Sequence, residues 1–147
     1  MRALKIRQAV ALQAEEVYPE ALRLAKLIRS DFQGQREEGA GRGQLRQLEA
    51  TICASDTVAG VLNYVKRQTA RLKPWRESGL GKELLRWIEE DLPNHLDGIR
   101  RRLVDQQAEP LTETETLAVR LSVIQEYVRA LVSQVEYLRV VEAGGPL

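Results

Sequence analysis

The 147-residue sequence contains one cysteine, one histidine and few aromatic residues. Cys53 has no second cysteine for an intrachain disulfide, which favours a reducing compartment and predicts a cytoplasmic location. Aromatic residues make up only 5%, so Leu, Val, Ile and Ala must fill most of the core. No apolar run approaches the ~20 residues that cross a bilayer, and no apolar stretch typical of a signal peptide follows Met1. We therefore expect no membrane partner.

The same scarcity limits the chemistry that the chain can perform. Ordinary zinc sites need clustered His, Cys or carboxylate ligands, but Cys53 is the only cysteine and His95 the only histidine. Cys53 is predicted to be a small buried residue, whereas His95, just after Pro93 at a predicted helix start, is expected on the surface or in a cap. The acidic residues 89–91 are adjacent, so on a helix they point in different directions and do not converge on one ion. We expect no enzyme, no metal and no cofactor.

Apolar residues recur at helical spacing along most of the chain, and no segment alternates with the period of a strand. The pattern predicts an all-α fold, a single-domain bundle over residues 1–147 with five or six helices and long first and last helices. The predicted helices cover residues 3–32, 44–54, 57–72, 80–91, 93–107 and 112–143.

Proline and glycine mark the breaks in this pattern. Pro19 interrupts the first apolar stripe without changing its phase, which favours one kinked helix over two helices. Residues 33–43 include four glycines and no apolar residue larger than alanine, and they are predicted to form a flexible loop. Gly144, Gly145 and Pro146 end the last helix, so residues 144–147 are predicted to be a disordered tail.

The last helix has the clearest sequence signals. Thr112 and Glu115 have the spacing of a capping box. Apolar residues then alternate at intervals of four and three, at Leu117, Leu121, Ile124, Val128, Leu131, Val135 and Leu138. This heptad stripe has two interpretations, a coiled-coil seam for self-association or one side of an intramolecular core. Further apolar residues widen the stripe, which favours the core.

Charge is distributed unevenly along the chain. The net charge is only +1, but residues 1–104 carry 19 basic and 14 acidic residues, whereas residues 105–147 carry three basic and seven acidic residues. Local potential governs binding more than net charge does. The chain is therefore expected to present a basic body and an acidic final helix to its partners.

A basic patch in the middle of the chain is the strongest candidate for a binding site. No acidic residue occurs between 57 and 76. Arg67 and Arg71 share a helix face, where like charges repel, and a phosphate backbone would relieve that repulsion. Trp75 is interpreted either as a stacking platform for a base or as a core residue. Basic residues near a helix end also simply complement the helix dipole. The candidate nucleic-acid-binding residues are Arg46, Lys66, Arg67, Arg71, Lys73 and Arg76.

The chain resembles the small, all-helical subunit of type III CRISPR effector complexes, and the ordered part of the match covers roughly residues 44–76. The matching features are the Gln44-Leu45-Arg46 string at a helix start, the basic helix over residues 61–71, and a long terminal helix that ends with residues 140–143. The resemblance implies a subunit without catalysis. Several copies of it would line a filament of guide and target nucleic acid and hold the backbone without reading sequence. Arg46, Lys66, Arg67 and Arg71 are the residues that match by position.

The expected function is therefore a non-catalytic subunit of a CRISPR-type ribonucleoprotein defence complex. Its expected partners are other subunits, copies of itself and the backbone of single-stranded RNA or DNA. The alternative is a homo-oligomeric helical scaffold or adaptor with no nucleic-acid role.

Overall fold

The computed structural model describes residues 1–32 and 40–142, and every regular element in these two stretches is helical. The first and last helices, α1 (Arg2–Phe32) and α7 (Glu113–Glu142), are the longest. This confirms the predicted all-α bundle. Between them lie α2 (Ala40–Cys53), α3 (Val58–Arg71), α4 (Lys73–Glu77), α5 (Leu80–Arg86), the π-helical turn η1 (Trp87–Asp91) and α6 (Leu92–Asp105).

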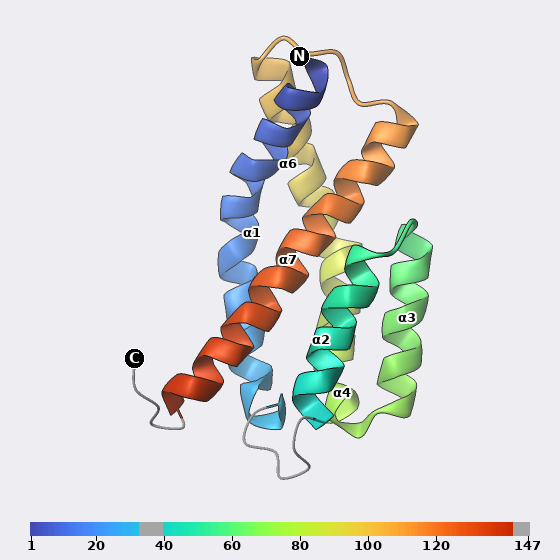
Figure 1. Ribbon diagram of the computed structural model, residues 1–147. Coiled ribbons are helices and arrows are strands. Elements are labelled where there is room, and N and C mark those ends of the chain that lie inside the picture. Colours follow the sequence, from blue (N-terminus) through green and yellow to red (C-terminus); the bar gives the residue numbers. More distant parts are fainter. Residues whose placement is uncertain (33–39, 143–147) are drawn as a thin grey trace.

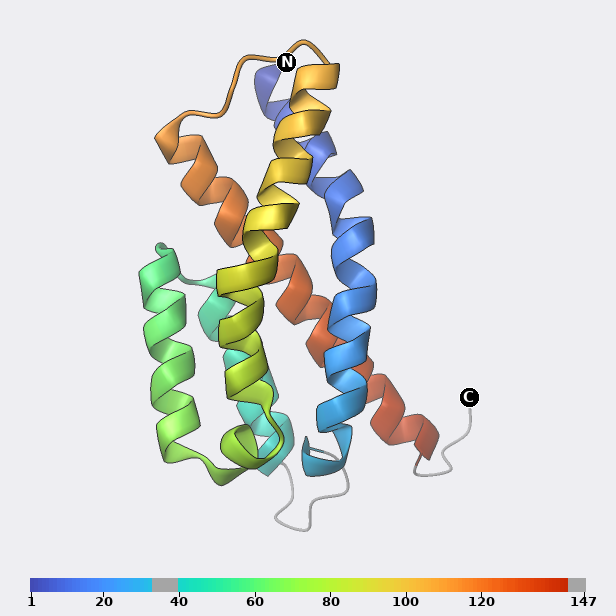
Figure 2. The same ribbon diagram turned by 180° about the vertical axis from the view of Figure 1, so that it is seen from behind.

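The long helices organise the molecule. In Figure 1, α7 runs diagonally across α1, and the two helices share the most extensive helix contact in the structure. α2 packs against α7 and α6 packs against α1, while α3 lies at the edge and contacts mainly α5 and α4. Figure 2 shows α5, η1 and α6 as one long helical run beside α1. No helix within residues 1–32 and 40–142 is long and apolar enough to cross a membrane.

The heptad stripe of α7 lies in the core of the single chain. Ile124 is 1% exposed, and Leu131 and Val135 are 0% exposed. Their side chains are covered within the bundle, where α7 packs chiefly on α1 and α2. The intramolecular interpretation is therefore confirmed for the central part of the stripe, from Leu121 to Val135.

The predicted capping box forms, and it does more than cap α7. The Thr112 amide donates to Glu115 Oε1 at 3.0 Å, and the Glu115 amide donates to Thr112 Oγ1 at 3.1 Å. Arg2 also binds both oxygens of Glu115, at 2.6 and 2.8 Å. The hydrogen bond from Arg2, with the backbone hydrogen bond from Thr112, lowers the pKa of Glu115 from 4.5 to about 2. This pair ties the start of α1 to the start of α7.

Two proline predictions have different outcomes. Pro19 lies inside α1, which continues through it as one helix, as expected. Pro93 was expected to start a separate helix, but α5, η1 and α6 follow each other without a break. A proline ring crowds the carbonyl four residues earlier in a regular α-helix. In η1 the Leu92 amide reaches back to the Trp87 carbonyl, and this wider turn directly before Pro93 lets the helical run continue.

The last four residues of the predicted loop over 33–43 are helical in the structure, because α2 already begins at Ala40. Helix therefore includes Gly41 and Gly43, one turn before the first buried leucine of α2, Leu45. The rest of that loop, residues 33–39, and the predicted tail, residues 144–147, lie outside the described residues.

Candidate nucleic-acid interface

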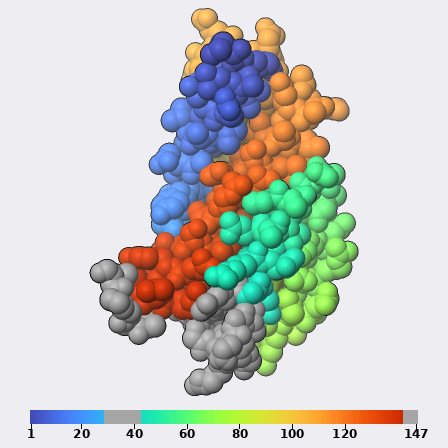
Figure 3. Space-filling view, viewed as in Figure 1, coloured from blue at the N-terminus to red at the C-terminus, as the bar shows by residue number. Residues whose placement is uncertain are grey.

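The outer face of α3 carries the centre of the predicted basic patch. Val58, Val61 and Val65 form the buried face of this helix. Lys66, Arg67 and Arg71 are exposed, as are Ala59, Asn63 and Ala70. α3 contains no carboxylate, and among the described residues Lys66, Arg67 and Arg71 form no ion pair. In Figure 3, α3 lies in green along the edge of the surface, beside α2.

Thr57 begins this helix and fixes its register. The Gly60 amide donates to Thr57 Oγ1 at 2.9 Å, which is a conventional N-cap. From that start, the spacing of the buried valines determines which side chains face solvent. The sequence therefore places the basic residues on the open side of α3 through ordinary helical periodicity.

The remaining predicted residues have other partners. Arg46 lies on α2 and points toward α7, where its Nε is 3.4 Å from Glu136 Oε2. Lys73 Nζ is 3.9 Å from Glu77 Oε2 in α4. Arg76 donates to the Ala70 carbonyl at 2.8 Å, where it satisfies the C-terminal end of α3. Of the six predicted residues, three are exposed and form no ion pair among the described residues, whereas Arg46, Lys73 and Arg76 each contact another group of the chain.

Trp75 belongs to the core. It is 0% exposed, and its ring meets the edge of Tyr64 at a centroid distance of 6.1 Å and an interplanar angle of 83°. A base stacks only on an accessible aromatic face. The core interpretation of Trp75 is therefore confirmed, and the basic face of α3 has no tryptophan platform beside it.

His95 is buried and Cys53 is exposed, which is the opposite of what the sequence suggested for each. His95 is 6% exposed, because it follows Leu92 by three residues and precedes Ile99 by four and so shares their buried face. Cys53 is exposed at the end of α2, where Ile52 is the buried residue. Both expectations were wrong. The helical spacing of the α6 stripe was the signal that could have placed His95 in the core.

Buried His95 lies in a polar network that sequence reasoning missed. Its Nδ1 is 2.8 Å from Gln13 Nε2, and its Nε2 is 2.8 Å from Glu20 Oε1. Trp87 Nε1 donates to the same Glu20 oxygen at 2.7 Å. Trp87 also stacks on Tyr127 with a centroid distance of 4.0 Å. Burial raises the pKa of the Tyr127 phenol.

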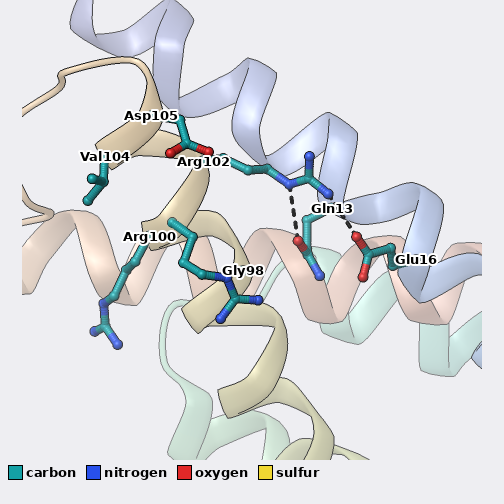
Figure 4. A pocket seen from close by; sticks show the side chains of 8 residues that line it. Gln13, Glu16, Gly98, Arg100, Arg102, Val104 and Asp105 are labelled. Carbon is teal, nitrogen blue, oxygen red and sulfur yellow. Dashed lines mark hydrogen bonds and ion pairs between the residues drawn. The ribbon is translucent and has the colours of Figure 1, made fainter.

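A cavity of about 510 Å³ lies between α1 and α6, next to this network (Figure 4). Arg102 crosses it, with Nε 3.2 Å from Gln13 Oε1 and a terminal nitrogen 2.8 Å from Glu16. Arg100 points away from these two residues in Figure 4, and it pairs with Asp97 at 3.4 Å. The three consecutive arginines 100–102 therefore have different environments, because Arg100 and Arg102 form ion pairs and Arg101 is exposed.

A larger groove of about 990 Å³ lies between α1 and α7. It is lined by small and apolar residues from both helices, including Ile6, Val10 and Val119, and Arg2 and Glu115 are among its other lining residues. Among the described residues, no three His, Cys, Asp or Glu side chains gather as metal ligands. Both ring nitrogens of His95 are hydrogen-bonded within its own network, so the described part of the chain pairs it with no cysteine nucleophile.

Comparison with known proteins gives no neighbour: no family model, curated protein or solved structure matches this chain.

Proposed function

We propose that this chain is a non-catalytic helical subunit of a cytoplasmic, CRISPR-type ribonucleoprotein complex, in which the outer face of α3 contacts nucleic-acid backbone. The observation that carries the proposal is the group Lys66, Arg67 and Arg71. These side chains are exposed on one helix that has no carboxylate, and they form no ion pair among the described residues. Such a surface attracts phosphates through charge and does not depend on base identity.

The position of α3 supports this role. α3 is an edge helix whose inner side is seated on α5 and α4, so a long polyanion can approach its outer side without displacing another helix (Figure 1). Arginine offers bidentate contacts to phosphate and lysine offers a point charge. The lack of an exposed tryptophan at this face agrees with contact to the backbone rather than to bases.

The alternative, a homo-oligomeric scaffold, rested on the heptad stripe of α7. That stripe is buried by the chain's own helices, with Ile124 and Leu131 no more than 1% exposed. A self-association surface would therefore have to lie elsewhere. In the proposed assembly, copies of the chain and other subunits meet through surfaces other than the heptad stripe.

A paired charge reversal tests the proposal. Binding of a fluorescent single-stranded RNA of mixed sequence is measured by anisotropy at low salt for the wild type and for R67E/R71E. Reversal turns an attraction of about 1 kcal/mol per close charge pair in water into a similar repulsion. The loss for two sites is therefore up to about 4 kcal/mol, or about 1,000-fold.

The matched control is R23E/R101E, which changes the net charge equally. Arg23 on α1 and Arg101 on α6 are also exposed and form no ion pair among the described residues. We expect the control to retain most of the affinity. Equal losses in the two double variants, or no RNA binding by the wild type at low salt, would refute the proposed function.

A further inference from the structure

Four residues from α1 and α6 form a chain of hydrogen bonds through the interior. Arg102 Nε donates to Gln13 Oε1 at 3.2 Å, the Gln13 amide nitrogen is 2.8 Å from His95 Nδ1, and His95 Nε2 is 2.8 Å from Glu20 Oε1. Gln13 is 3% exposed and His95 is 6% exposed. Water therefore does not replace these contacts readily.

The residues at the two ends of this hydrogen-bond chain determine which group donates and which accepts in each contact. Arg102 can only donate, so the carbonyl oxygen of Gln13 must face it. The amide NH₂ of Gln13 then donates to His95 Nδ1, which must be unprotonated. At the other end, Glu20 Oε1 accepts from Trp87 Nε1–H, a pure donor, and from His95 Nε2–H. The contacts are therefore satisfied together only by the neutral Nε2–H tautomer of His95.

Gly98 provides the space that this arrangement needs. A Cβ atom at position 98 would lie 2.4 Å from Gln13 Oε1 and 2.8 Å from Gln13 Cδ. These separations are shorter than van der Waals contact, so any larger residue would push the amide away from His95 and Arg102. Gly98 lies about one turn after His95 and one turn before Arg102, on the side of α6 that faces α1.

We infer that this hydrogen-bond chain is a proton-operated switch between the buried histidine and the cavity between α1 and α6. A proton taken from solvent at His95 Nδ1 would face the NH₂ of Gln13, donor against donor. The Gln13 amide must then rotate by half a turn, so that Oε1 accepts from Nδ1–H. The same rotation points the NH₂ at Arg102, and the bond between Arg102 and Gln13 breaks.

The surroundings allow both states. The added positive charge on His95 is met by Glu20 of α1 at 2.8 Å, while Arg102 keeps its ion pair with Glu16 of α1 at 2.8 Å. Tyr127 of α7 stacks on Trp87, with Glu83, Arg86 and Asp91 beside Tyr127. On the cavity side, Arg100, Arg101 and Asp105 of α6 are the other charged groups. Proton uptake therefore releases the Arg102 Nε–H into the cavity, where it can bind an anion or water.

The single histidine makes the tautomer directly measurable. In nitrogen NMR of the labelled protein, the imidazole signals come from a single histidine, so they need not be assigned among residues. At neutral pH, we expect the shifts of an acceptor at Nδ1 and a donor at Nε2. On acidification, the Arg102 Nε–H signal should change with the same midpoint as the imidazole signals. A protonated Nδ1 at neutral pH, or two different midpoints, would overturn the inference.

Two variants test the cause. R102M removes the donor that orients Gln13, and G98A displaces the amide, so in both we expect the shift difference between the two imidazole nitrogens to shrink. R101M is the control, because Arg101 lines the same cavity and is not the residue that donates to Gln13. An unchanged shift difference in R102M, or an equal decrease in R101M, would contradict the switch. Arg102 is a partly exposed side chain, so R102M remains a test even if G98A does not fold.

Discussion

Replacing Gly81 by alanine should destabilise the protein, although alanine is the better helix former. Gly81 is buried in α5 against α3, and a Cβ atom there would lie 1.8 Å from Thr69 Oγ1 and 2.8 Å from Thr69 Cβ. Thr69 cannot easily turn away, because its hydroxyl donates to the Val65 carbonyl at 2.7 Å. One of the two helices must therefore move, and α3 carries the proposed binding face.

The magnitude follows from two opposing effects. Alanine in place of glycine within a helix gains up to about 1 kcal/mol. An extra methyl group in a tightly packed contact costs typically about 1–3 kcal/mol. Since the Thr69 Cβ is also too close, a side-chain rotation alone does not relieve the clash. We expect G81A to lower the free energy of unfolding by about 1–2 kcal/mol, and the Tm by about 3–6 °C.

Urea and thermal unfolding followed by circular dichroism measure this effect. The control is G43A, because a Cβ atom at Gly43 in α2 would have no heavy atom within 4 Å. That variant should be neutral or stabilised by up to about 1 kcal/mol. T69A should partly rescue G81A in a double-mutant cycle, since it removes two of the three close atoms. If G81A were stabilised as much as G43A, the α3–α5 contact described above would be wrong.

Three further predictions concern other parts of the bundle. E115Q should lower the free energy of unfolding at pH 7. The pKa of Glu115 in the folded protein is lowered to about 2, so the stabilisation from its carboxylate is fully present above pH 4.5 and is lost as the pH falls through 2. The unfolding curves of the wild type and E115Q should therefore converge near pH 2. L131A should cost about 2–5 kcal/mol without changing the sedimentation of the native protein, whereas dissociation of an oligomer would restore the seam interpretation. Cys53 should react with a thiol reagent in the folded protein about as fast as in urea, and protection would contradict its exposure.

Local pattern was sufficient to predict most of the helices. The stripe of α7 and its capping box depend on residues close together in sequence, and both form as expected. The bidentate partner of Glu115, Arg2, is 113 positions away, and no local rule could have selected it. The continuous run through Pro93 was also missed, because a π-helical turn has no short sequence signature.

The positions of the basic residues in the candidate site were predictable, but the ion pairs and hydrogen bonds that some of them form in the fold were not. Helical spacing alone put Arg67 and Arg71 on one exposed face of α3. Whether a basic residue remains open depends on which carboxylates and carbonyls the fold brings near it, as the contacts of Arg46 and Arg76 show. His95 was misplaced for a related reason. Proximity to Pro93 suggested a helix start on the surface, whereas the packing of α6 on α1 buries that turn.

The salt dependence of RNA binding tests the central claim most directly. If Lys66, Arg67 and Arg71 each neutralise one phosphate, log K should fall with log salt with a slope of about −2 for single-stranded RNA, or about 20-fold between 50 and 200 mM. R67Q/R71Q should reduce the slope to about −0.7, while R23Q/R101Q should leave it unchanged. A wild-type slope near zero, or one that R67Q/R71Q does not alter, would contradict a nucleic-acid interface on α3.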